Sequence, residues 1–458
     1  MAMTIDRRRF LKGALGASGA LVLGSRLGRM FPAEASGPLP PLLPDPGGSG
    51  IEHVVVVMME NRSFDHFLGW LPGANGVQDT TTLKYPDANG TLHANTHLTD
   101  PMGCAHPDPD HSYEGGRYQL DGGAMDNFAR GNNDAYAVGF YTEADRPFTS
   151  ALARNFTTCD NYFCSILAET YPNRFFIHAA QTDRLHNSFT EATIPTIWDQ
   201  LNRTGGPTGR YYFSDVPFLA LWGPTYLSIA SPYKRFLIDA AAGTLPNVSF
   251  VDPRFEDEGS GTSGDDHPHA HIGAGDAFLA DVFKAVTCSP CWQNTVLVVT
   301  WDEWGGFYDH VVPPRATPGV PIGSSASSGL DQDLVNDQVL LGLRVPCLVA
   351  SPFSKGVSAT PRISSQLFDH TSVLKLIEWR WGLNALTQRD ASTLGTDPGN
   401  LANVLDFSSP DASVPSGIPH PAPPIAVPCS PVSPPALASG STTWAGLRAS
   451  GLLAGWRA

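Results

Sequence analysis

Three short apolar runs constrain the fold of this chain more than any other feature. They are VVVV at 54–57, NTVLVVTW at 294–301 and VPCLVASP at 345–352. None alternates polar and apolar residues, which is the pattern of strands buried on both faces of a sheet. Residues 275–286, between the first two runs, and residues 369–381, after the third, carry apolar side chains at helical spacing. We therefore predict an α/β fold, a three-layer α/β/α sandwich with a mostly parallel central sheet.

Polar side chains follow two of these runs where each strand should end. Glu60 and Asn61 follow the first run, and Asp302 and Glu303 follow the second. Ligands of such sheets bind outside the carboxyl ends of the strands. Four oxygen-bearing side chains at one sheet edge predict a site for one divalent cation, with Ca²⁺, Mg²⁺ or Mn²⁺ favoured over Zn²⁺. The alternative for the first pair is an exposed, capped strand–helix turn.

A third segment, ILAETYPNRFFIHAAQ at 166–181, predicts a helix with Pro172 in its first turn. Thr170 would then lie just before the helix begins, where free amides and the helix dipole favour a phosphate. The alternative is that Thr170 only caps this helix.

Together these segments resemble the phosphoesterase family of bacterial phospholipases C and a related acid phosphatase, within the alkaline-phosphatase-like superfamily. The resemblance covers about residues 51–405. It rests on six motifs in this order: MMENRSFDHFLG, TYPNR, DDHPH, TWDEWGGFYDHVVPP, RVPCLVASPF and FDHTSVLKLIE.

The resemblance implies roles for the residues found above. Glu60, Asn61, Asp302 and Glu303 would hold the metal, and the hydroxyl of Thr170 would be the nucleophile. Threonine at this place is typical of the phospholipases, whereas the acid phosphatase has serine. The chain departs from the pattern where the phospholipases have Gly-Pro, because Ala168 and Glu169 stand there. The head-group preference therefore stays open.

The departing alcohol needs a proton, and imidazole is the natural donor near neutral pH. The resemblance supports His267, in DDHPH, and His111, in PDPDHSY, as catalytic residues of the phosphate pocket. The alternative for each is a solvated loop histidine. We expect His310 and His370 to be structural. For Arg174 we expect a structural pair with a carboxylate, and the alternative is a contact with the phosphate.

These observations predict an exported phospholipase C that cleaves the glycerol-side phosphodiester of phosphatidylcholine-like lipids. The products would be diacylglycerol and a phosphorylated head group, formed through a phosphothreonine intermediate during transient contact with a lipid surface. One alternative is an acid phosphatase acting on phosphomonoesters with the same nucleophile and metal. A second alternative is a surface-binding protein without enzymatic activity.

The start of the chain indicates export. Residues 1–35 contain RRRFLK before a short Gly/Ala-rich apolar stretch, which resembles a twin-arginine signal peptide read by the twin-arginine export machinery. We therefore expect a periplasmic, cell-envelope or secreted protein without a transmembrane anchor. Removing the net +4 of this segment from the total of −15 leaves −19, which disfavours nucleic acid as a partner.

The expected organisation places the catalytic domain between two segments rich in proline. A Pro/Gly linker (36–50) precedes the phosphoesterase domain (51–407), and a Pro-rich tail (408–458) follows it. Seven cysteines leave at least one unpaired within the monomer. For the pair in CSPC, at 288 and 291, we expect a local disulfide or free thiols rather than zinc.

Overall fold

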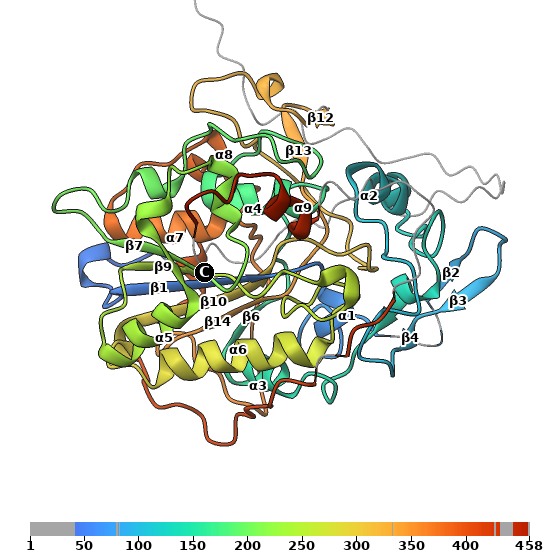
Figure 1. The fold of residues 1–458 in the computed structure, drawn as a ribbon, viewed down its shortest axis with the longest axis horizontal. Helices are drawn as coiled ribbons and strands as arrows, with labels where there is room; N and C mark the ends of the chain where they lie inside the picture. The colour runs from blue at the N-terminus through green and yellow to red at the C-terminus, as the bar shows by residue number, and fades with distance from the viewer. Residues whose placement is uncertain are drawn as a thin grey trace, which may run out of the picture. The chain divides into compact units, whose positions relative to one another are not determined.

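A sheet of eight strands lies at the centre of the described residues, in the order β15-β6-β14-β10-β1-β9-β7-β8 (Figure 1). The structure, a computed structural model, describes residues 42–78, 81, 83–331, 333–425, 427–430 and 443–456. The predicted signal peptide and the first part of the predicted linker lie outside these residues. The strands of the sheet are β1 (His53–Met59), β6 (Thr157–Cys159), β7 (Gly209–Phe213), β8 (Ala230–Pro232), β9 (Val248–Val251), β10 (Thr295–Trp301), β14 (Cys347–Ala350) and β15 (Arg362–Ser364).

β1 and β10, the two strands that are followed by polar residues, are neighbours at the centre of this sheet. β1 and β10 pair in parallel along their whole length, and Met59 lies opposite Trp301 at their ends. Apart from His53, both strands are buried along their length within the main hydrophobic core. Because the paired strands end at the same level, Glu60 and Asp302 emerge side by side.

In the described sheet, β14 alone runs against its neighbours. It pairs antiparallel with β10 and β6, while the other pairings are parallel. The sheet is therefore mostly parallel, as predicted. The sequence of β14 is as apolar as that of β1, because burial on both faces depends on helix cover and not on strand direction.

Helices cover both faces of the sheet, which confirms the three-layer arrangement (Figure 1). Below the sheet in this view lie α3 (Pro147–Asn155), α5 (Tyr233–Ala242) and α6 (Ile272–Thr287). Above it lie α4 (Thr170–Ala179), α7 (Thr371–Trp381) and α8 (Gln388–Ala391). The helices predicted at 275–286 and 369–381 are thus α6 and α7.

The remaining strands and α-helices are short and lie in the connections. They are α1 (Phe64–Leu68), α2 (Tyr113–Leu120), α9 (Trp444–Ala449), β2 (Lys84–Pro86), β3 (Leu92–Ala94), β4 (Thr96–His97), β5 (Gly139–Phe140), β11 (Arg315–Ala316), β12 (Leu334–Val335) and β13 (Gln338–Leu340). Every helix among the described residues is too short or too polar to span a bilayer.

Parts of the predicted tail contact the catalytic domain. A disulfide joins Cys104 to Cys429, and α9 buries the side chains of Trp444 and Leu447. Cys288 and Cys291 are both free thiols, one of the two outcomes expected for them.

Candidate active site

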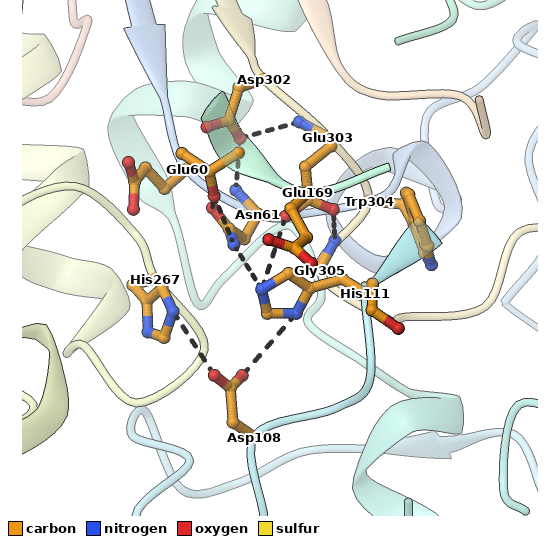
Figure 2. Close-up of polar contacts among 12 residues, drawn as sticks. Glu60, Asn61, Asp108, His111, Glu169, His267, Asp302, Glu303, Trp304 and Gly305 are labelled. Atoms are coloured by element: carbon orange, nitrogen blue, oxygen red, sulfur yellow. Dashed lines mark hydrogen bonds and ion pairs between the residues drawn. The ribbon is translucent and has the colours of Figure 1, made fainter. Parts of the chain in front are cut away.

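Four polar side chains converge where β1 and β10 end. Glu60, Asn61, Asp302 and Glu303 are all buried. The backbone N–H groups of Asn61 and Glu303 donate to the same Oδ1 of Asp302, at 3.0 and 2.7 Å. The structure thus brings together the four residues that the sequence predicted as metal ligands (Figure 2).

The turn after β10 must be made of glycine. Asn61 has a φ of 58°, in the left-handed region, and Gly305 passes against its carbonyl oxygen with a φ of 64°. A Cβ atom on Gly305 would stand 2.0 Å from that oxygen. The N–H of Gly305 also donates to Oε2 of Glu303 at 2.6 Å. Backbone strain of this kind collects at functional sites.

Thr170 points its hydroxyl at Asn61. Its Oγ1 lies 3.3 Å from Nδ2 and 3.5 Å from Oδ1 of Asn61. Thr170 is the first residue of α4, and Glu169 occupies the N-cap position without a capping side-chain bond. The alternative that Thr170 only caps the helix is therefore wrong, and so is its expected place just before the helix begins. Instead, the Glu169 carboxylate accepts from the backbone N–H of Asn187 at 2.6 Å.

Arg174, one turn further along α4, pairs with three buried carboxylates. Its guanidinium lies 3.0 Å from Oδ2 of Asp302, 3.3 Å from Oε1 of Glu60 and 3.5 Å from Oδ1 of Asp252. The side chain is 2% exposed. The structural pairing that we expected for Arg174 is therefore present, and its positive charge compensates part of the negative charge around Glu60.

Both predicted catalytic histidines lie at this site and share one carboxylate (Figure 2). Nε2 of His111 lies 3.2 Å from Nδ2 of Asn61 and 3.9 Å from Oε1 of Glu303. Asp108 lies between the rings, with one oxygen 4.0 Å from Nδ1 of His111 and the other 3.5 Å from Nε2 of His267. His267 is 8% exposed, so the prediction of a solvated loop histidine does not describe it.

The two imidazoles have opposite electrostatic environments. Burial lowers the pKa of His111, but the carboxylates of Glu303 and Asp108 outweigh it and raise this pKa to about 10. Burial lowers the pKa of His267 to about 3, although Asp108 acts in the opposite direction. Neighbouring imidazoles with divided protonation states are typical of sites that transfer protons.

Buried carboxylate oxygens without hydrogen bonds mark where a cation fits. Oε1 of Glu60 and Oε1 of Glu303 accept none, and burial raises the pKa of both residues well above the ordinary range. Both oxygens of Asp302 are already bonded, to backbone amides and to Arg174. The unpaired oxygens suit a hard cation, whose charge would compensate their desolvation.

Further acidic residues, which the sequence analysis did not name, lie close to these ligands. Oxygens of Glu60, Glu258 and Asp265 lie within 4.8 Å of one another, as do ligand atoms of Asp108, His111 and His267. Asp265 belongs to the DDHPH motif, which was the available signal for it. Glu258 lies in a Gly-rich loop with no comparable pattern.

His310 and His370 make contacts of the kind expected for structural residues. Nδ1 of His310 lies 2.5 Å from Oδ2 of Asp65. Nε2 of His370 lies 2.7 Å from the carbonyl oxygen of Asp302, and its Nδ1 lies 3.2 Å from the Tyr162 hydroxyl.

Comparison with known proteins identifies the family. Residues 51–384 match the sequence profile of the Phosphoesterase family, and this segment contains all seven candidate site residues. The chain belongs to the Phosphoesterase family. As a member, it is a phosphoric ester hydrolase, which excludes the alternative of a surface-binding protein without enzymatic activity.

Several phosphoesterases are similar to this chain over most of its length. "Phospholipase C B" of Mycobacterium tuberculosis is 31% identical, over 91% of this chain and 88% of the relative. "Non-specific phospholipase C1" of Arabidopsis thaliana is 32% identical, over 74% and 69% respectively. "Non-hemolytic phospholipase C" of Pseudomonas aeruginosa is 30% identical, over 89% and 64%.

Similarity to solved structures is weaker. A protein of the alkaline phosphatase superfamily from Vibrio parahaemolyticus aligns with a TM-score of 0.35 and 11% identity, over 75% of this chain and 70% of that protein. At this TM-score, the likeness adds nothing to the family assignment, which depends on the sequence matches.

Proposed function

We propose that this phosphoesterase is a phospholipase C. It would cleave the glycerol-side phosphodiester of phosphatidylcholine-like lipids and release diacylglycerol and a phosphorylated head group. Three relatives from a mycobacterium, a plant and a pseudomonad, all named phospholipase C, support this substrate class.

The observation that carries the proposal is the place of the Thr170 hydroxyl. It lies 3.3 Å from the side-chain amide of Asn61, at the start of α4. The Thr170 oxygen attacks the phosphorus atom, and the bond from phosphorus to the glycerol oxygen breaks. Water then cleaves the phosphothreonine and frees the phosphorylated head group.

Glu60, Asn61, Asp302 and Glu303 would hold one divalent cation, and Asp302 also orders the backbone of Asn61 and Glu303. When bound, the cation would favour the deprotonated threonine hydroxyl and stabilise negative charge on the phosphoryl oxygens.

His111 and His267 supply the imidazoles of the reaction. They come from two loops, and both lie against Asp108, which orients them. The departing diacylglycerol takes a proton from an imidazole, and the attacking water gives one up in the second step. A pair of imidazoles beside the nucleophile serves both transfers.

Assays of the purified full chain on phosphatidylcholine vesicles and on p-nitrophenyl phosphate test the proposal. We expect diacylglycerol release from the vesicles and much slower turnover of the aryl phosphate. Thr170→Ala should lower lipid turnover by at least about 10³-fold, whereas Thr287→Ala, at the end of α6, should not change it. Hydrolysis of the aryl phosphate alone would instead indicate a phosphomonoesterase of the acid phosphatase type.

A trapped intermediate tests the nucleophile directly. Acid quenching during turnover, followed by peptide mass spectrometry, should find phosphate on Thr170. Full lipid turnover by folded Thr170→Ala would remove this residue from the mechanism.

We also propose that the enzyme is exported by the twin-arginine route. The Cys104–Cys429 disulfide supports this, because such bonds persist in oxidising compartments. Arg7→Lys combined with Arg8→Lys should leave the protein in the cytoplasmic fraction of an expressing bacterium. Unchanged export of that variant would contradict the proposal.

A further inference from the structure

A residue near the end of the chain reaches the first candidate metal ligand. Trp444 begins α9 and is 2% exposed. Its indole Nε1 lies 3.4 Å from Oε2 of Glu60, so the N–H donates to that carboxylate. Oε1 of the same carboxylate faces Arg174 at 3.3 Å. Glu60 is therefore held between a guanidinium on one side and an indole on the other.

Aromatic rings fix the plane of this indole. Trp444 stacks on Phe255, with ring centroids 4.2 Å apart and an interplanar angle of 10°. Tyr171 packs on it with centroids 5.1 Å apart. Aromatic contacts of this kind each contribute about 0.5–1.5 kcal/mol beyond burial. The ring cannot rotate away from Glu60 without losing them.

A second bond joins Trp444 to the same acidic cluster. Its backbone N–H donates to the carboxylate of Glu258, whose oxygen lies within 4.8 Å of those of Glu60 and Asp265. Trp444 thus connects two members of the cluster through one backbone and one side-chain donor. Oε1 of Glu60 accepts no hydrogen bond and faces only the guanidinium of Arg174.

Contacts along the tail keep Trp444 in place. Leu447 is fully buried, and Arg448 forms an ion pair with Glu256. The indole of Trp456 donates to the carbonyl oxygen of Gly223 at 3.2 Å. Upstream, Cys429 is tied to Cys104 by the disulfide.

We propose that Trp444 is a positioning residue for the cation site: its indole N–H fixes the orientation of the carboxylate of Glu60, which is one of the residues that would hold the cation. The proposal rests on the proposed cation site but not on the lipid substrate. Partners that orient a ligand typically change metal affinity by about 10–100-fold when they are removed. Trp444 would therefore act on metal affinity and only through it on turnover.

The test measures binding of Mn²⁺, used as the probe, to the metal-stripped full chain by equilibrium dialysis. Trp444→Phe keeps a ring on Phe255 but loses the N–H donor, and we expect an increase of about tenfold in the Mn²⁺ dissociation constant. Trp444→Ala loses ring and donor, and we expect a larger increase. Trp292→Phe is the matched control and should bind as the wild type does, because it removes a buried indole donor to the carbonyl oxygen of Ala412 before β10 begins, at the other end of that strand from Asp302.

Turnover against Mn²⁺ concentration provides a second measurement. If Trp444 only positions Glu60, saturating Mn²⁺ restores most of the kcat of Trp444→Phe and leaves KM for the phosphoester near the wild-type value. Thermal unfolding shows whether each variant is folded. If Trp444→Ala is not folded, the Mn²⁺ affinity of Trp444→Phe alone tests the inference.

Two outcomes overturn the inference: folded Trp444→Phe and Trp444→Ala both bind Mn²⁺ as tightly as the wild type, or the wild type binds no divalent cation. Failure of the substrate proposal would be recognised by a different result. A wild type that binds Mn²⁺ but does not hydrolyse phosphatidylcholine contradicts the lipid substrate and leaves the role of Trp444 intact.

Discussion

The backbone N–H of Asn61 donates to Oδ1 of Asp302 across 3.0 Å, joining the end of β1 to the end of β10. This bond fixes the left-handed backbone of Asn61 and thereby aims its side-chain amide at Thr170. The register between β1 and β10 thereby determines which group the Thr170 hydroxyl contacts.

Gly305→Ala should damage both stability and activity. The new Cβ atom would meet the carbonyl oxygen of Asn61 at 2.0 Å, on a backbone with a φ of 64°. We expect about 1 kcal/mol from the backbone, a further ~1–3 kcal/mol from the collision, and near-complete loss of turnover. Gly382→Ala is the matched control, because its φ is also 64° but no atom lies within 4 Å of the new Cβ. Denaturant unfolding should show only the backbone cost there, with full activity. Equal effects of the two substitutions would contradict the close approach.

Arg174→Met should destabilise the fold by about 3–5 kcal/mol, because buried carboxylates would lose their partner. Asp302 and Glu60 both face this guanidinium. Urea unfolding of the full chain measures the effect. Arg254→Met removes a pair with Asp257 whose side chains are 43% and 62% exposed, and should cost less than about 1 kcal/mol. Similar values for both variants would mean that Arg174 is not needed to compensate the buried charge.

Metal removal should abolish turnover reversibly. Stripping the protein with EDTA leaves the unpaired oxygens of Glu60 and Glu303 without a cation, so we also expect a lower midpoint of thermal unfolding. One of Ca²⁺, Mg²⁺ or Mn²⁺ should restore activity, and elemental analysis of the purified protein should find one ion per chain. Full activity of protein shown by the same analysis to be metal-free would exclude a catalytic cation.

His178 should make the protein less stable in acid. Burial among aromatic rings, together with the charge of Arg174, lowers its pKa to about 3, whereas the unfolded chain binds a proton near pH 6.5. The stability associated with this neutral imidazole is thus complete above about pH 6.5 and falls toward pH 3, by up to about 1.4 kcal/mol per pH unit. His178→Leu should remove this part of the slope in chemical unfolding measured from pH 7 to pH 4. An unchanged slope would contradict a neutral His178 in the folded state.

The sequence was sufficient for the central layer and for the polar groups at its edge. β1 and β10 are buried on both faces, and such strands are recognisable without knowledge of their partners. Asn61 and Asp302 follow them directly, so their meeting required only that the two strands be parallel neighbours. The direction of β14 was not predictable from its apolar pattern, which is the same for either direction.

Apart from His111 and His267, which lie in recognisable motifs, the site residues contributed by loops and by the tail could not be predicted from the sequence. Glu258 and Asp108 reach the site on long connections whose paths depend on tertiary contacts. Trp444 follows a Pro-rich stretch, and the sequence around it does not distinguish a helix that packs on the domain from one that makes no contact. The helix boundary at Thr170 was off by one position, since Glu169 takes the N-cap place without a capping side chain.

The indole that orients Glu60 belongs to a residue 384 positions later in the chain. A ribosome therefore synthesises the Glu60 carboxylate long before the indole that orients it. On this arrangement, nascent chains and chains cut short before α9 have an incomplete cation site, so the hydrolase reaches its full cation affinity only after α9 has been synthesised and has docked.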